Sequence, residues 1–328
     1  MKASVIVPVR NGAGIIGRCL EALLGQDWPQ GDYEIIVVDD GSTDATAEVV
    51  ARFPQVTLLR QPPGGPAEAR NRGIAAAQGA FVLFTDADCA PRPDWLRRMV
   101  TAVEQRGAAG GKGIYATGQR SLVARFVQLE YETKYRRMAR EPQIDFVDTY
   151  AAIYRREVLL EVGGFDERFP TASVEDQELS FRIAERGYKL VLVPDAVVEH
   201  LHAATVRAYA RKKFRIGYWK MLVLKEHPAK MVRDSHTPQS LKVEIVLTAL
   251  WGASWLWSLA ILSPAPALVG LAVLLASWAP FLAFVARRDP PVLAMAPLLL
   301  FLRAAALGLG MIWGALKLRR LAAATPGR

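Results

Sequence analysis

Apolar and polar positions alternate in short blocks along the first part of the chain. Apolar runs short enough to be buried strands occur at residues 4–9, 34–38, 56–60 and 81–85. Between them, apolar residues recur at helical spacing in residues 15–24, 45–53 and 67–77. This alternation of strand and helix predicts an α/β fold of parallel βαβ units wound on a sheet.

The pattern continues less regularly beyond residue 120. It predicts helices over residues 121–140 and 157–162, a helix beginning at residues 174–182, and a long helix over 205–226. Strands are predicted over residues 147–154, 188–193 and 197–202. The first of these helices carries Arg125, Arg136, Arg137 and Arg140, which suit either a solvated face or a contact with substrate or lipid headgroups. We therefore expect one α/β domain over residues 1–203.

The last quarter of the chain has the pattern of a membrane segment. Residues 245–286 contain no charged side chain, and Ser263-Pro264-Ala265-Pro266 divides them into two apolar stretches. The stretches 245–262 and 267–286 are each close to the roughly 20 residues that span the hydrocarbon core of a bilayer. We therefore predict a hairpin of two transmembrane helices within a membrane region at residues 241–328.

A third apolar stretch, residues 292–316, is interrupted by Arg303. If this stretch crosses the membrane, the basic tail at Lys317, Arg319 and Arg320 lies outside, against the positive-inside rule. If it re-enters or lies in the interface, the tail stays inside. The sequence leaves both arrangements open, and a phosphate headgroup is a plausible partner for an arginine within the membrane.

The distribution of charged residues supports a membrane location for the end of the chain. The chain of 328 residues is 52% hydrophobic with a net charge of +9, and residues 241–328 contain eight basic but only two acidic residues. The helix over 205–226 is basic as well as amphipathic, and with its linker (residues 204–240) it is expected to lie on the cytoplasmic leaflet. The basic charge thus indicates membrane lipids as partners rather than nucleic acid. The oligomeric state stays open.

The cysteine content and the N-terminus indicate where the domain works. The chain contains two cysteines, Cys19 and Cys89, which suits a reducing compartment. The apolar run that follows Met1-Lys2 is too short for a signal peptide. We expect a multi-pass protein of the cytoplasmic membrane with its α/β domain in the cytoplasm.

Acidic residues follow two of the predicted strands. Asp39 and Asp40 end one strand, and Asp86 and Asp88 follow another. The carboxyl ends of parallel strands meet at one edge of a sheet, so both pairs should face one crevice. Clustered carboxylates suit a hard divalent cation shared with phosphate oxygens, namely Mg²⁺ or Mn²⁺. A solvated loop is the alternative for the second pair.

A further acidic pair, Glu175 and Asp176, opens a predicted helix. These acids are explained either by the helix dipole, which stabilises negative charge at a helix N-terminus, or by a role as general base. His200 and His202, one residue apart, point to the same side of a strand and are candidate metal ligands. Packed or surface histidines are the alternative.

Four segments in order resemble the family-2 glycosyltransferases of the GT-A fold: Ser4-Val5-Ile6-Val7-Pro8, Val37-Val38-Asp39-Asp40-Gly41-Ser42-Thr43-Asp44, Ala69-Arg70-Asn71-Arg72-Gly73 and Thr85-Asp86-Ala87-Asp88. The resemblance covers residues 1–225 and extends through Gly163-Gly164-Phe165-Asp166 and Glu175-Asp176. It implies a Rossmann-like GT-A domain that takes a nucleotide-diphosphate sugar. The chain departs from the processive members, because Lys212-Lys213-Phe214-Arg215-Ile216 keeps only the arginine of their Gln-x-x-Arg-Trp motif.

The resemblance assigns roles to individual residues. Those that would bind the nucleotide sugar are Pro8, Arg10, Asp40, Arg70, Asp86 and Arg215. Gly164 would line the acceptor side, Asp88 would hold the metal with help from His200 or His202, and Asp176 beside Glu175 would be the catalytic base. For Asp44, capping of the next helix is favoured over a role at the site.

These observations predict a membrane-anchored, metal-dependent, inverting glycosyltransferase. Its acceptor would be membrane-associated, either a polyprenyl-phosphate-linked intermediate or a growing envelope glycan. Two alternatives remain open at this point. One is a sugar-phosphate nucleotidyltransferase, for which Arg10-Asn11-Gly12-Ala13-Gly14 is only a faint glycine-rich loop. The other is a non-catalytic membrane scaffold that keeps the fold.

Overall fold

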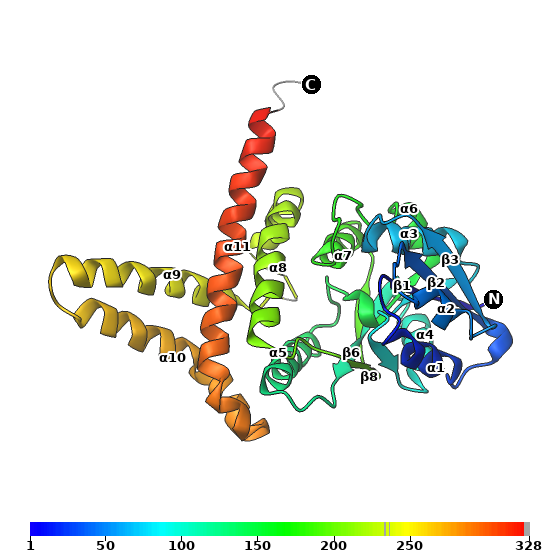
Figure 1. The fold of residues 1–328 in the computed structure, drawn as a ribbon, viewed down its shortest axis with the longest axis horizontal. Helices are drawn as coiled ribbons and strands as arrows, with labels where there is room; N and C mark the ends of the chain where they lie inside the picture. Colours follow the sequence, from blue (N-terminus) through cyan, green and yellow to red (C-terminus); the bar gives the residue numbers. More distant parts are fainter. Residues whose placement is uncertain (233, 236, 325–328) are drawn as a thin grey trace. The chain divides into compact units, whose positions relative to one another are not determined.

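A computed structural model describes residues 1–232, 234–235 and 237–324, and for residues 319–324 the backbone only. The chain divides into two compact units. The first unit comprises residues 1–118 and 135–201, and the second comprises residues 119–134 and 202–328. Figure 1 shows the elements of both, coloured along the sequence.

The first unit is built on an eight-stranded sheet with the order β3-β2-β1-β4-β7-β6-β8-β5. Its strands are β1 (Ala3–Val9), β2 (Tyr33–Asp40), β3 (Val56–Gln61), β4 (Phe81–Phe84), β5 (Cys89–Pro91), β6 (Gly110–Ala116), β7 (Ala152–Arg155) and β8 (Leu190–His200). Strands β1 to β4 are mutually parallel, as predicted, whereas β7 runs antiparallel to β4 and to β6. The sheet is therefore mixed: the predicted parallel units form β1 to β4, and antiparallel pairing begins with β7.

Helices connect these strands. They are α1 (Ile16–Leu24), α2 (Thr46–Val50), α3 (Pro66–Ala76), α4 (Trp95–Gln105), α6 (Arg156–Glu161) and α7 (Glu175–Glu185). α1 shows how the pattern produces its element: Ile16, Cys19, Leu20 and Leu23 recur at helical spacing and all four are buried. The predicted helices are confirmed, although α2 ends three residues earlier than residue 53.

Three regions differ from the sequence-based elements. Residues 147–154 form a 3₁₀ turn (Thr149–Ala151) followed by β7, because Asp148 turns away to pair with the buried Lys112. The two runs at 188–193 and 197–202 form one strand, β8, whose pairing with β6 shifts register between Lys112 and Ile114. The helix α4 and the strand β6 lie in residues 92–120, for which the pattern predicts no element.

The second unit is helical. It contains the first part of α5 (Leu122–Met138), then α8 (Val206–Glu226), α9 (Gln239–Ala260), α10 (Ala265–Arg288) and α11 (Ala296–Ala324). Among the residues that the structure describes, three helices are long and apolar enough to cross a membrane: Gln239–Ala260, Ala265–Arg288 and Ala296–Leu318. α9 and α10 form a hairpin, which Figure 1 shows projecting to one side of α11.

Candidate active site

The two acidic strand ends lie at the same edge of the sheet. β2 and β4 both pair in parallel with β1, which lies between them, so Asp40 at the end of β2 and Asp86 just after β4 share this edge. This edge is where ligands bind in open α/β sheets. The structure therefore places both acidic motifs at this edge.

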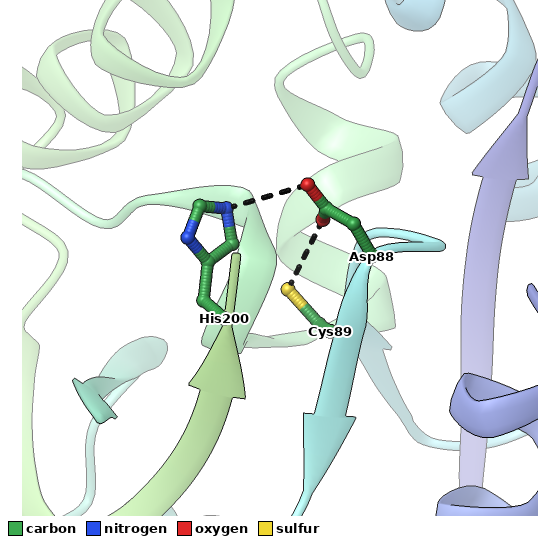
Figure 2. Close-up of side chains that lie close together, drawn as sticks. All are labelled: Asp88, Cys89 and His200. Carbon is green, nitrogen blue, oxygen red and sulfur yellow. Dashed lines mark hydrogen bonds and ion pairs between the residues drawn. The ribbon is translucent and has the colours of Figure 1, made fainter. Parts of the chain in front are cut away.

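Three potential metal ligands meet beside this edge. Asp88, Cys89 and His200 each offer an atom to one point, and these atoms lie within 4.8 Å of one another (Figure 2). The short strand β5 causes this, because it pairs antiparallel with β8 and sets Cys89 opposite His200. His200 Nε2 lies 3.7 Å from Asp88 Oδ2, and the Cys89 thiol donates to Asp88 Oδ1 at 3.6 Å.

This donor set fits a divalent cation. A carboxylate and an imidazole suit Mn²⁺, and a thiolate adds affinity for softer ions such as Zn²⁺. Asp88 remains one-third exposed, so a ligand from the crevice can reach the same ion. Burial and the carboxylates of Asp86 and Asp88 hold the pKa of Cys89 well above its usual range, so without a cation the thiol is protonated.

Arg70 joins the strand end to the helix that carries the candidate base. Its side chain is 3% exposed, and its two terminal nitrogens donate to different carboxylates. Nη1 donates to Glu175 at 2.8 Å, and Nη2 donates to Asp86 at 3.1 Å. The guanidinium also lies over the Phe165 ring, 5.5 Å from its centroid. Arg70 thereby positions the start of α7 at the acidic edge of the sheet.

Glu175 and Asp176 differ in what surrounds them. Glu175 is buried, and its oxygens accept from Arg70 and from the backbone of Ser173 at 2.7 Å. Asp176 is half-buried, and its Oδ1 accepts from the backbone of Gln177 at 2.8 Å. Burial and the neighbouring Glu175 charge raise the pKa of Asp176 to about 7, a value suited to a general base near neutral pH. Arg70 and the Ser173 backbone thus hold both oxygens of Glu175, whereas Asp176 accepts from one backbone N–H.

A buried lysine also acts on this base. Lys112 on β6 is 1% exposed and pairs with Asp148. Its ammonium lies over three aromatic rings, at 5.2 Å from the centroid of Phe146, 5.3 Å from Tyr135 and 5.7 Å from Tyr150. Burial lowers the pKa of Lys112 to about 7, while its positive charge lowers that of Asp176. Lys112 therefore limits how far the pKa of the base rises.

At the predicted nucleotide end, Asp40 already has protein partners. Its carboxylate accepts from Gln61 Nε2 at 2.9 Å and from the backbone of Gly64 and Gly65 at 2.7 and 2.9 Å. These bonds hold the loop that leads into α3 and so to Arg70. Pro8 lies at the end of β1, with the exposed Arg10 just beyond.

Two further residues of the sequence-based set have local structural roles. Gly164 has φ +68°, and a Cβ there would lie 2.4 Å from Asn71 Oδ1, which accepts from the Phe165 backbone at 2.8 Å. Asp44 accepts from the backbone of Ala13 and Thr46, both at 3.1 Å, and so joins two loops at this end of the sheet.

His202 and Arg215 belong to the second unit. His202 Nε2 lies 3.0 Å from Gln128 Oε1 and its ring stacks on Tyr131, so the cluster of candidate ligands contains His200 and not His202. Burial and the charge of Lys212 lower the pKa of His202 to about 4, which keeps its ring neutral. Arg215 is exposed on α8.

The sequence reasoning missed Cys89 and Lys112. Cys89 directly follows the acidic motif, but its approach to His200 depends on the pairing of β5 with β8. Lys112 carries a signal that could have been read, namely a lysine inside Gly110-Gly111-Lys112-Gly113-Ile114, a short strand between apolar neighbours.

Comparison with known proteins agrees with this geometry. Residues 4–163 match the family model "Glycosyl transferase family 2". Glycosyltransferase AglE of Haloferax volcanii is 30% identical over 224 residues, which are 65% of this chain and 71% of that protein. The pre-mycofactocin glycosyltransferase of Mycobacterium tuberculosis is 31% identical over 251 residues, covering 69% of this chain but only 48% of its own length.

Solved structures share the fold. The mannosyltransferase PcManGT of Pyrobaculum calidifontis, in complex with GDP-Man and Mn²⁺, superposes with a TM-score of 0.61 over 95% of this chain and 87% of that one, at 24% identity. The predicted GT-A architecture is thereby confirmed, as is the prediction of candidate membrane helices after it. From its sequence relatives and its fold, the chain belongs to the family-2 glycosyltransferases.

Proposed function

We propose that this glycosyltransferase moves a sugar, with inversion, from a nucleotide-diphosphate sugar to a hydroxyl of a membrane-associated acceptor, and that Asp176 is its general base. The observation that carries the proposal is the double contact of Arg70 with Asp86 and Glu175. This contact sets the α7 terminus, and so Asp176, against the crevice at the strand ends.

In the proposed reaction, Asp176 takes the proton of the acceptor hydroxyl as its oxygen attacks the anomeric carbon. The new glycosidic bond forms on the face opposite the bond to the diphosphate, which breaks with its electron pair on the departing oxygen. One carboxylate on the acceptor side is sufficient for this chemistry. The pKa of Asp176, about 7, leaves much of it ionised at neutral pH.

The divalent cation, Mg²⁺ or Mn²⁺, would be held by Asp88 and His200 with Cys89 beside them. When bound, it supplies the positive charge that stabilises the diphosphate as leaving group. Asp86, one-third exposed and held by Arg70, would face the same end of the donor.

A membrane-associated acceptor is supported by the helices that follow the catalytic unit. Three of them are long and apolar enough to cross a membrane. Confining enzyme and acceptor to one membrane raises their effective concentration. We therefore propose a polyprenyl-phosphate-linked intermediate or a growing envelope glycan as acceptor, with the catalytic unit in the cytoplasm.

The test is nucleotide-diphosphate release and sugar transfer by the detergent-solubilised full chain, with and without Mn²⁺. Asp176→Asn should lower the transfer rate at least 100-fold, as expected for loss of a general base. Glu185→Gln, on an exposed turn of the same helix, is the matched control and should keep the wild-type rate. Equal transfer rates of the wild-type and Asp176→Asn chains would refute the assignment of Asp176 as the general base.

The donor can be identified separately. A panel of nucleotide sugars, measured by thermal shift with Mn²⁺ present, should raise the melting temperature for the donor that binds the folded chain. If none of the panel raises it while the protein is folded, the nucleotide-sugar proposal fails.

A further inference from the structure

Within the second unit, α11 packs on α8 with their backbones in contact. A Cβ at Gly310 would lie 2.2 Å from the backbone oxygen of Phe214, and one at Gly314 would lie 2.3 Å from that of Tyr218. On α8, a Cβ at Gly217 would meet a backbone oxygen of α11 at 2.3 Å. Only glycine permits this approach, which small residues four apart typically provide in membrane helices. Later residues of α11 meet later residues of α8, so the two helices run in parallel (Figure 1).

Buried ion pairs secure the beginning of this helix pair. Glu130 on α5 accepts from Arg303 Nη1 at 2.9 Å and from Lys213 Nζ at 3.0 Å. Arg303 Nη2 donates to Glu244 on α9. The arginine therefore has carboxylate partners within the protein. Because Arg303 and Lys213 share one carboxylate, residues near 303 on α11 lie beside residues near 213 on α8.

The outer faces of the two helices differ in character. On α8, Arg207, Arg211 and Arg215 follow one another at four-residue spacing and are exposed. On α11, one helical face exposes large apolar side chains, namely Leu309 (60%), Ile312 (60%), Trp313 (63%) and Leu316 (47%). The pair thus has a basic stripe on one helix and an apolar face on the other.

This arrangement bears on whether α11 crosses the membrane. Arg211 and Arg215 of α8 lie beside the middle of the apolar segment Ala296–Leu318, and Arg207 lies beside its beginning. If α11 spanned the bilayer, α8 would have to accompany it, and the exposed Arg211 and Arg215 would lie at hydrocarbon depth. Charged side chains there are costly and face protein or water rather than lipid.

If the α8–α11 pair lies in the plane of the bilayer, both its apolar face and its arginines have a suitable environment. We propose that α8 and α11 together form a membrane-binding surface that lies along the bilayer interface, with the α9–α10 hairpin as the inserted element. The apolar face of α11 then meets acyl chains, while the arginines of α8 remain among phosphates and water. The hairpin and α8 lie on different sides of α11 in Figure 1, which suits insertion of the hairpin alone.

The proposal predicts on which side of the membrane individual residues lie. The beginning and the end of the hairpin share one side, its tip reaches the other, and the end of α11 stays on the first side. Lys317 should therefore lie on the same side as Arg287, opposite Ser263. A crossing α11 would place Lys317 with Ser263.

Labelling of introduced cysteines tests this in the full-length chain. Ser263→Cys, Arg287→Cys and Lys317→Cys are made singly in the wild-type background, whose Cys19 and Cys89 are buried. A membrane-impermeant maleimide is applied to spheroplasts and to permeabilised cells of a bacterial expression host. We expect Ser263→Cys to label in intact spheroplasts, and Arg287→Cys and Lys317→Cys to label only after permeabilisation.

Labelling of Lys317→Cys from the outside, or from both sides, would overturn the proposal. A fluorescent protein fused after Arg328 gives an independent reading that requires no cysteine. It should fluoresce as strongly as one fused to a cytoplasmic control, and a dark, exported fusion would also overturn the proposal. Neither reading depends on transferase activity, so this result is separable from the proposed function.

Discussion

Two ionisable side chains of the catalytic unit have pKa values displaced toward neutrality by the same burial. Asp176 is raised and Lys112 is lowered, each to about 7. The lysine stabilises the ionised form of the acid and so keeps the base active at lower pH. Asp148 and three aromatic rings hold the lysine in place.

The pH dependence of transfer follows from these values. Asp176 accepts a proton only when ionised, so activity should fall as pH drops through about 7. Replacing Lys112 with Met removes a positive charge, raises the pKa of the base, and should move the acid limb to higher pH by about one unit. Rate–pH profiles of both proteins measure the shift.

The matched control for this shift is Lys189→Met, a lysine outside the aromatic cluster whose ammonium donates to the backbone of Arg106. Its profile should match the wild type. Melting temperatures show whether Lys112→Met remains folded. A folded Lys112→Met chain with an unmoved acid limb would refute the coupling of Lys112 to Asp176.

The three candidate metal ligands Asp88, Cys89 and His200 allow a second prediction for single residues. Asp88→Asn should abolish the rise in melting temperature that Mn²⁺ produces, because a carboxylate ligand is lost. Cys89→Ser should keep most of the Mn²⁺ effect but weaken binding of Cd²⁺ or Zn²⁺ at least 10-fold, because a soft ligand is replaced by a hard one. Thermal titrations with each ion check both results. Equal Cd²⁺ affinity of Cys89→Ser and wild type would show that the thiol is no ligand.

Some of these residues could be predicted from the sequence and others could not. Asp88 and Asp176 lie in local motifs whose chemistry is recognisable from a few neighbours. Cys89 and Lys112 depend on which strands pair, and strand pairing is not local in the sequence. The partners of Asp40 also come from a loop more than 20 residues away.

At the scale of elements, the turn that follows α6 contains two consecutive glycines. Gly163 and Gly164 both have positive φ, at +81° and +68°. Only Gly164 is crowded, because Asn71 fills the space that a side chain would need. A side chain at Gly163 would therefore meet backbone strain alone, whereas one at Gly164 would meet backbone strain and a clash with Asn71.

Alanine at each position should separate these two effects. Gly163→Ala should cost about 1 kcal/mol of unfolding free energy, which is the cost of a left-handed backbone for a residue with a Cβ. Gly164→Ala should cost about 1–3 kcal/mol more, because Asn71 must move and its bonds to Phe165 weaken. Denaturant unfolding measures both, and equal losses would show that Asn71 yields without cost.

Elements with a regular period were the most predictable. The apolar runs of β1, β2 and β4 could be recognised as strands from their own residues alone. The region around Thr149 did not follow its apolar pattern, because the pairing of Asp148 with Lys112 bends the chain there. Tertiary contacts override local preference at such a site.

For the molecule as a whole, the sequence predicted a catalytic unit followed by membrane helices, but it did not identify the partners of Arg303. A lipid phosphate was the plausible partner from the sequence. In the structure the guanidinium lies between two carboxylates, Glu130 and Glu244, from different helices. The sequence shows that a charged residue lies within an apolar segment. The partner of that residue depends on how helices distant in the sequence pack together.

Removing this arginine should destabilise the helical unit. Arg303→Leu leaves the buried Glu244 without its cation and leaves Glu130 with Lys213 alone, and breaking a buried pair in this way typically costs about 3–5 kcal/mol. The double variant Arg303→Leu/Glu244→Leu should regain part of that loss, because one unpaired carboxylate is gone. Melting temperatures in detergent measure the series. Arg288→Leu, which breaks an exposed pair with Glu132, is the control and should shift little.

The double contact of Arg70 has a consequence for how the donor enters. Arg70 joins Asp86 after β4 to Glu175 at the start of α7, so the acidic pairs Asp86/Asp88 and Glu175/Asp176 lie around a cation that is already engaged, and Lys112 is engaged by Asp148. An anionic diphosphate approaching these acids meets repulsion unless it arrives with a counter-charge of its own. Nucleotide and divalent ion should therefore enter as one species, each improving the affinity of the other.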